Sequence, residues 1–143
     1  MRYHFRIHKE KKGYWAESLE QGLGVSTQGN TLAELETNLR EALNLALNEP
    51  DDSKWVPPMP DESFQGKNVL SISVEPRIAL ATLIRISRLK QGLTQRRAAD
   101  KMGIKHIRQY QLLESGNANP GLGTLVKLKK TYPELSLDAA ATV

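Results

Sequence analysis

Side chains suited to contacting DNA are concentrated in one stretch of this 143-residue chain, between residues 94 and 111. Their hydroxyl, amide and cationic groups can pair with base edges in a major groove, and the cations can also bind phosphates. Between Arg85 and Arg108 there are eight Lys or Arg residues and one acid, Asp100. A helical bundle with a basic, solvated face is the alternative that charge alone leaves open. The candidate DNA-contact residues are Thr94, Gln95, Arg96, Lys105, His106, Arg108, Gln109 and Gln111.

Catalytic and metal-binding chemistry has little support in the sequence. There is no cysteine, which excludes thiolate metal sites, cysteine nucleophiles and disulfides. Two-metal phosphoryl transfer needs clustered carboxylates, yet the polar residues of segment 2–8 are all Arg or His. His4 and His8 share a face of this segment but lack a third ligand, so contact with solvent or a protein partner is favoured. We therefore expect no catalytic residue, metal or cofactor, and a protein that is not an enzyme.

The N-terminal half offers candidate contacts to a protein partner. Residues 1–66 carry 7 Lys or Arg against 11 Asp or Glu, a net −4, whereas residues 67–143 carry 13 against 5, a net +8. Opposite charges predict different partners for the two halves, although solvated faces that differ in sign would give the same counts. Trp15, Glu17 and Glu20 are the candidate partner contacts, and for Trp15 a place in a sheet core is equally expected.

The N-terminal half reads as a small sheet with one helix. Residues 2–8 alternate apolar and polar side chains, which predicts a half-buried strand, and residues 14–19 and 25–28 can follow as further strands. Thr31 and Glu34 form a T-x-x-E capping box for a helix whose apolar stripe continues to Leu47. Alternation over residues 68–74 predicts a fourth strand that returns to the same sheet.

The domain boundary is expected at Glu75-Pro76. Residues 48–66 hold four prolines and five acids without periodicity, so they are expected to form a connector inside the first domain. The expected domains are therefore residues 1–75 and 76–143. No apolar run approaches the roughly 18 residues that a membrane span needs, and we expect a soluble, cytoplasmic protein with no membrane partner.

The C-terminal half reads as helical, with a tight turn between two short helices. Pro76 suits the first position of a helix, and Gly92 suits its end. Thr94 is expected to cap the next helix, and Ala99 is small enough for two helices to cross closely. Gly103 can adopt the left-handed conformation that a sharp turn needs, before a helix expected over Lys105–Leu113.

This spacing resembles the XRE-type helix-turn-helix family over residues 83–137. From Gly103 to Glu114 the chain has one residue more than the family's usual spacing, and its placement decides which side chains of the second helix face DNA. The resemblance implies binding to double-stranded operator DNA by a homodimer or higher homo-oligomer. The matching residues are Leu93-Thr94-Gln95, Ala98-Ala99, Met102-Gly103-Ile104, Leu113-Glu114, Gly116, Pro120, Leu122 and Thr124-Leu125.

The front segment, over residues 1–50, resembles HicB antitoxins through Gly13-Tyr14, Ala16-Glu17, Gly24, Thr27-Gln28-Gly29-Asn30-Thr31 and Glu41-Ala42-Leu43. The resemblance implies an α+β protein, in which a partial ribonuclease-H-like β-β-β-α-β domain precedes an all-α helix-turn-helix domain. It also implies a HicA-like toxin partner, a small basic ribonuclease that cleaves mRNA, and an antitoxin that represses its own operon. The alternatives are a stand-alone transcriptional regulator, whose N-terminal domain binds a ligand or dimerises, and a degenerate nuclease.

Overall fold

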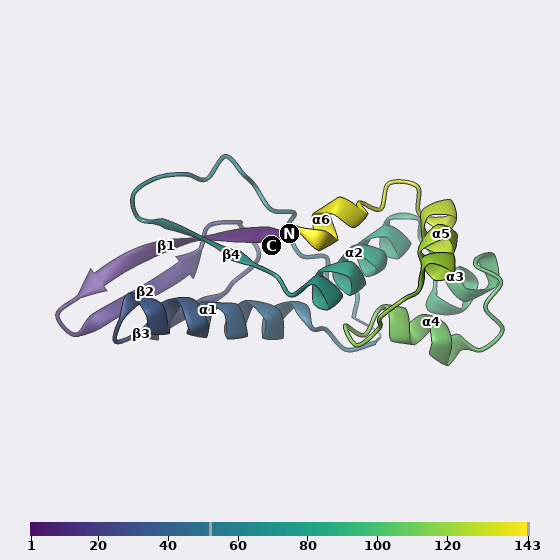
Figure 1. Ribbon diagram of the computed structural model, residues 1–143, viewed down its shortest axis with the longest axis horizontal. Coiled ribbons are helices and arrows are strands. Elements are labelled where there is room, and N and C mark those ends of the chain that lie inside the picture. Colours follow the sequence, from purple (N-terminus) through teal and green to yellow (C-terminus); the bar gives the residue numbers. More distant parts are fainter. Residues whose placement is uncertain (52, 143) are drawn as a thin grey trace. The chain divides into compact units, whose positions relative to one another are not determined.

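The computed structural model describes residues 1–51 and 53–142 and divides the chain into two compact units. The N-terminal unit comprises residues 1–47 and 56–75 with Thr142, and the helical unit comprises residues 48–55 and 76–141. The expected α+β class, the β-β-β-α-β order and the all-helical C-terminal part are confirmed (Figure 1). In chain order the elements are β1 (Arg2–Glu10), β2 (Gly13–Ser18), β3 (Ser26–Gly29), α1 (Leu32–Leu47), β4 (Val69–Ser73), α2 (Pro76–Lys90), α3 (Gln95–Lys101), α4 (Ile107–Leu113), α5 (Leu122–Thr131) and α6 (Leu137–Ala141).

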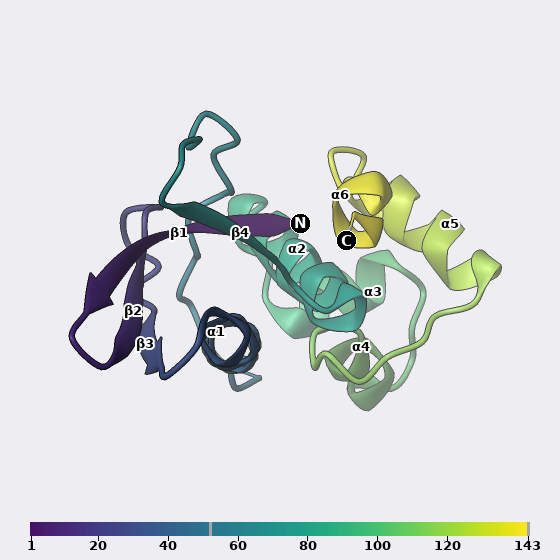
Figure 2. The ribbon, with the colours of Figure 1, turned by 60° about the vertical axis from the view of Figure 1, so that its left-hand side comes forward.

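The N-terminal unit is a four-stranded sheet with α1 on one face. The strand order is β3-β2-β1-β4 and every neighbouring pair is antiparallel, so the fourth strand returns to the sheet as expected. The register places Ile7 opposite Ala16 and Tyr3 opposite Ile72, which puts their side chains on the same face. Figure 2 shows α1 nearly end-on beside this face of the sheet.

Helix α1 begins at the predicted capping box. The backbone N–H of Glu34 donates to the hydroxyl of Thr31 at 3.1 Å, and the Glu34 carboxylate accepts from the N–H of Asn30 at 3.2 Å. One stripe of α1 is buried and completes the core under the sheet. This core contains Leu35, Leu39, Leu43 and Leu47 of the helix and Tyr3, Phe5, Ala16 and Ile72 of the strands.

The connector is shared between the two units, which differs from its expected place inside one domain. Within the described residues of the range 48–68 there is no helix or strand, yet both parts are held by hydrogen bonds. In the N-terminal unit, Tyr3 donates its hydroxyl to the Pro58 carbonyl at 2.7 Å. In the helical unit, Gln95 donates its amide to the Asp51 carbonyl at 2.8 Å. Residues 48–55 therefore belong with the helices, and residues 56–68 with the sheet.

Among the described residues, no helix is both long enough and apolar enough to cross a membrane.

A substitution at Gly29 tests the close contact between β3 and α1. A Cβ added there would lie 2.5 Å from the backbone nitrogen of Leu35, and backbone cannot easily move aside. We expect Gly29→Ala to lower the free energy of unfolding by about 1–3 kcal/mol, the usual cost of overpacking. Urea denaturation followed by circular dichroism measures this change.

The matched control is Gly123→Ala in α5, where an added Cβ meets no atom within 4 Å. Alanine is favoured over glycine in helices by about 1 kcal/mol, so this variant should be as stable as the wild type or slightly more stable. Wild-type stability in Gly29→Ala would contradict the described packing.

Candidate nucleic-acid interface

Helix α3 and the turn after it adopt the predicted geometry. The Thr94 hydroxyl accepts from the N–H of Arg97 at 3.1 Å, which caps the first turn of α3. Ala99 is fully buried, and Gly103 has a φ of +71°, in the left-handed region. The N–H of Ile104 then donates to the Ala99 carbonyl at 2.8 Å. These contacts close the sharp turn that leads toward α4.

Helix α4 begins at Ile107, two residues later than the expected start at Lys105. His106 is the extended residue before the helix and makes no side-chain capping bond. The expected first turn of this helix is therefore part of the turn between α3 and α4. Lys105 and His106 consequently lie in this turn, where both are exposed.

A buried ion pair connects the end of α4 to α2. Arg88 of α2 donates to both carboxylate oxygens of Glu114, over 2.7 Å from Nε and 3.0 Å from Nη2. The two side chains are only 7% and 2% exposed. Burial opposes the charge on Arg88, but the hydrogen bond and charge of Glu114 outweigh it and raise the pKa of Arg88. Arg88 also donates to the Leu93 carbonyl at 2.9 Å, so one guanidinium joins α2, α4 and the start of α3.

A second buried contact fixes the inward side of α4. The hydroxyls of Tyr110 in α4 and Tyr132, which ends α5, lie 2.7 Å apart. Burial and the nearby Glu114 carboxylate raise the pKa of Tyr110, so its hydroxyl stays protonated. With Arg88–Glu114, this contact determines which side of α4 is directed away from the core.

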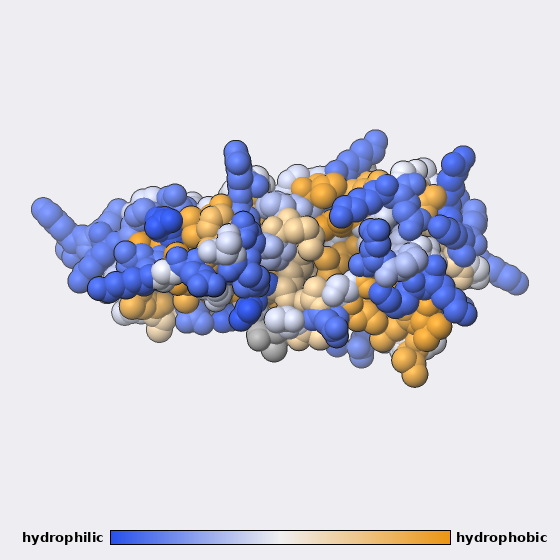
Figure 3. All heavy atoms as spheres, turned by 90° about the horizontal axis from the view of Figure 1, so that it is seen from above, coloured by the Kyte–Doolittle hydropathy of each residue, from blue (hydrophilic) through white to orange (hydrophobic). Residues whose placement is uncertain are grey.

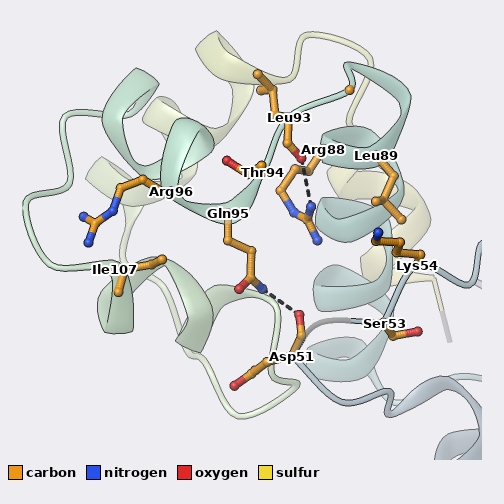
Figure 4. A pocket seen from close by; sticks show the side chains of 11 residues that line it. Asp51, Ser53, Lys54, Arg88, Leu89, Leu93, Thr94, Gln95, Arg96 and Ile107 are labelled. Atoms are coloured by element: carbon orange, nitrogen blue, oxygen red, sulfur yellow. Dashed lines mark hydrogen bonds between the residues drawn. The ribbon is translucent and has the colours of Figure 1, made fainter.

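The structure places the eight predicted DNA-contact residues on α3 and its N-cap, on α4 and in the turn between the two helices. Arg96, Lys105, His106, Arg108 and Gln109 are exposed, as is Thr94. Gln95 and Gln111 are half-buried and bonded to each other, because Gln111 donates to the Gln95 amide oxygen at 3.2 Å. The Gln95 amide nitrogen in turn points to Asp51 (Figure 4).

Two residues of this surface were missed by sequence reasoning. Lys54 of the connector lines a cavity of about 520 Å³ together with Thr94, Gln95 and Arg96. No local pattern relates Lys54 to α3, which lies some 40 positions further along the chain. Leu112 of α4 is 51% exposed, although it is a large apolar residue. A search of the sequence for polar contact residues does not select a leucine. The sequence does show, however, that Leu112 follows Arg108 by four positions, about one helical turn.

Of the predicted protein-contact residues, Trp15 and Glu17 lie on the sheet face opposite α1. Trp15 is half-buried and stacks on the imidazole of His8, with ring centroids 4.1 Å apart and an interplanar angle of 14°. The same imidazole lies 3.5 Å from the Glu17 carboxylate. Trp15 is therefore outside the core beneath α1, and its role as a partner contact stays a prediction.

Glu20 does not offer its carboxylate to a partner, which corrects its prediction as a contact. The residue is 3% exposed, and one carboxylate oxygen lies 2.6 Å from Nδ1 of His4. The other oxygen accepts from the backbone N–H of His4 at 3.0 Å. Glu20 thus compensates a buried imidazole. Within the described ranges, no three His, Asp or Glu side chains are arranged to hold a metal ion.

The Arg88–Glu114 pair gives a direct test of how α4 is held. Glu114→Gln leaves the guanidinium of Arg88 buried without its counter-charge, and we expect a loss of about 3–5 kcal/mol in unfolding free energy. Thermal and urea denaturation of the full chain measure the loss. A double variant, Arg88→Met with Glu114→Met, removes both charges and should recover much of the stability. An equal loss in the single and double variants would contradict a charge-based role.

Comparison with known proteins adds one finding to this geometry. No curated protein matches the chain significantly. Residues 84–139, which run from within α2 into α6, match the helix-turn-helix family HTH_3. This range contains the capped α3, the Gly103 turn and α4 with its buried Glu114. The chain therefore contains an HTH_3-type helix-turn-helix domain over residues 84–139, which suggests a DNA-binding regulator.

Proposed function

We propose that this protein is the antitoxin of a toxin–antitoxin pair and represses its own operon. The helical unit holds operator DNA as a homodimer, since a single helix-turn-helix contacts too few base pairs for useful specificity. The N-terminal unit binds a small basic ribonuclease of the HicA kind and performs no catalysis itself. The observation that carries the proposal is the pairing of a helix-turn-helix with a second unit whose sheet leaves Trp15 outside its core.

The DNA-binding half is supported by the electrostatics around α4. Arg108 of α4 and the nearby Arg96 and Lys105 are exposed cations, while Glu114, the acid at the end of α4, is buried and neutralised by Arg88. A surface of this kind suits a phosphate backbone, and binding should weaken steeply as salt rises.

The toxin-binding half is supported by the sheet face opposite α1. Trp15 provides a large aromatic surface, and His8 and Glu17 beside it provide polar groups. Tryptophan is enriched among the residues that dominate protein interfaces. The excess of acids over bases in residues 1–66 suits a basic partner.

A polar cavity in the N-terminal unit favours the alternative, a regulator that senses a small ligand. This cavity has a volume of about 290 Å³ and lies between the β1–β2 hairpin, the end of β3 and the start of α1. Lys12, Tyr14 and Asn38 are among its lining residues. A polar ligand that binds here and changes DNA affinity, with no toxin gene nearby, would support this second function.

DNA binding is tested with duplex DNA from immediately upstream of the gene. Arg108→Ala removes an exposed guanidinium from the outward side of α4 and should weaken binding by about 1–3 kcal/mol. Lys9→Ala removes the same charge from the N-terminal sheet and should leave affinity unchanged. A mobility-shift titration compares the two. Equal affinity of Arg108→Ala and wild type would move the contact surface away from α4.

Toxin neutralisation is tested by expressing the small basic protein encoded next to this gene. Cells should survive with the wild-type chain, and the two proteins should copurify. The double variant Trp15→Ala with Glu17→Gln should weaken the complex by about 2 kcal/mol or more, as expected at an interface centre.

The matched control is Glu36→Gln, which removes one acid from α1, on the other side of the sheet. It should bind and protect as the wild type does. If the neighbour is equally harmless without this chain, the antitoxin proposal fails. If the double variant protects fully, the toxin binds elsewhere.

A further inference from the structure

Leu112 is an apolar residue on the outward side of α4. Its side chain is 51% exposed, whereas its neighbour Leu113 is 6% exposed. A leucine that faces solvent loses the free energy that burial would provide, about 1.5–3 kcal/mol for the whole side chain. Single exposed leucines are common on protein surfaces, so exposure by itself does not indicate a contact site.

Helix geometry places Leu112 together with Arg108. Successive residues of a helix are turned by about 100°, so residues four apart lie on one stripe. Tyr110 and Leu113 are buried and define the inward side of α4. Arg108 then lies about 170° and Leu112 about 130° from the middle of that side, and both are exposed.

The stripe of Arg108 and Leu112 is bordered on each side by residues that contact or approach other helices. On one flank, Gln111 is half-buried and bonded to Gln95 of α3. On the other, Gln109 lines a hollow of about 370 Å³, which Leu112 also borders and which continues to Thr124 and Lys127 of α5. Figure 3, which views the opposite side of the helical unit, where α5 and α6 lie, shows hydrophobic residues exposed among hydrophilic ones there.

We propose that Leu112 is a specificity-determining residue that selects thymine by packing against its C5 methyl group in the major groove. The proposal rests on the proposed DNA binding and deepens it. Thymine is the one DNA base that carries a methyl group at the major-groove edge, and apolar side chains recognise it by contact. Arg108, one turn earlier on the same stripe, pairs with a neighbouring guanine or phosphate.

Charge complementarity favours duplex DNA over a protein as the occupant of this stripe. The exposed charges nearest to it along the chain, Lys105 and Arg108, are cationic, and Lys127 lines the hollow beside it. Glu114, the acid that follows α4, is 2% exposed and paired with Arg88, so it does not repel phosphates at the surface. The cations around the stripe match the phosphates that line a major groove, and Leu112 matches the methyl group of a thymine inside that groove.

The test uses a duplex selected from a random-sequence pool by the full-length protein. Each thymine is replaced in turn by deoxyuridine, which removes the methyl group and keeps the base pairing. At one position per half-site, wild-type affinity should fall about four-fold, close to the 0.8 kcal/mol of one buried methyl-sized group. Leu112→Ala should bind the thymine duplex about four-fold or more weakly and lose its sensitivity to that replacement.

The matched control is Leu122→Ala, which truncates a leucine of α5 that is 78% exposed. It should bind as the wild type does and keep the sensitivity to deoxyuridine. Circular dichroism of all variants checks that they fold.

The possible results distinguish a failure of the role of Leu112 from a failure of DNA binding itself. If the wild type binds duplexes but no thymine is sensitive, or Leu112→Ala keeps the full sensitivity, the role of Leu112 is overturned while DNA binding stands. If sedimentation shows that Leu112→Ala loses self-association and no methyl group matters, Leu112 belongs to a protein interface and the proposal fails. If no duplex is selected, the proposed function itself fails.

Discussion

Arg88 and Glu114 lie 26 positions apart in the sequence and form the buried ion pair on which the rest of the helix-turn-helix depends. A buried charge is tolerated only where a counter-charge and hydrogen bonds compensate its lost hydration. The end of α4 is therefore held to α2, and Arg88 also holds the start of α3 through the Leu93 carbonyl. Since Tyr110 is turned inward at the same time, Arg108 and Leu112 are left on the outside. The candidate DNA surface is thus a consequence of interior contacts.

In the N-terminal unit, too, buried polar side chains satisfy each other, and the loop over them covers one part of a sheet face. His4 and Glu20 are both buried and bonded to each other, and the backbone N–H of Asp61 donates to Glu20 at 3.3 Å. The loop that contains Asp61 thereby closes the His4 end of this face. Further along β1, the side chain of His8 stacks on Trp15 instead. The part of this face that the loop leaves open is therefore the Trp15 end, not the whole polar face of the sheet.

Local signals in the sequence predicted most of the fold, including the capped start of α3 and the turn after it. Thr31 and Thr94 cap helices as expected, because a capping hydroxyl acts on an N–H only three residues away. Errors arose where distant residues decide. Glu20 looked like a surface acid, but a histidine 16 positions earlier buries it. The connector looked like one segment, but Gln95 and Tyr3 bind its two parts in different units.

The sequence by itself determined the order of strands and helices, the sharp turn at Gly103 and the basic character of the region around α4, since periodicity, capping and charge are readable over a few residues. Tertiary structure alone decided where α4 begins, which of its side chains face outward, and which acids remain exposed. Those outcomes depend on how buried groups from distant segments satisfy one another. One residue of slippage would rotate α4 by about 100°, and the contacts of Tyr110 and Glu114 with residues outside α4 oppose it.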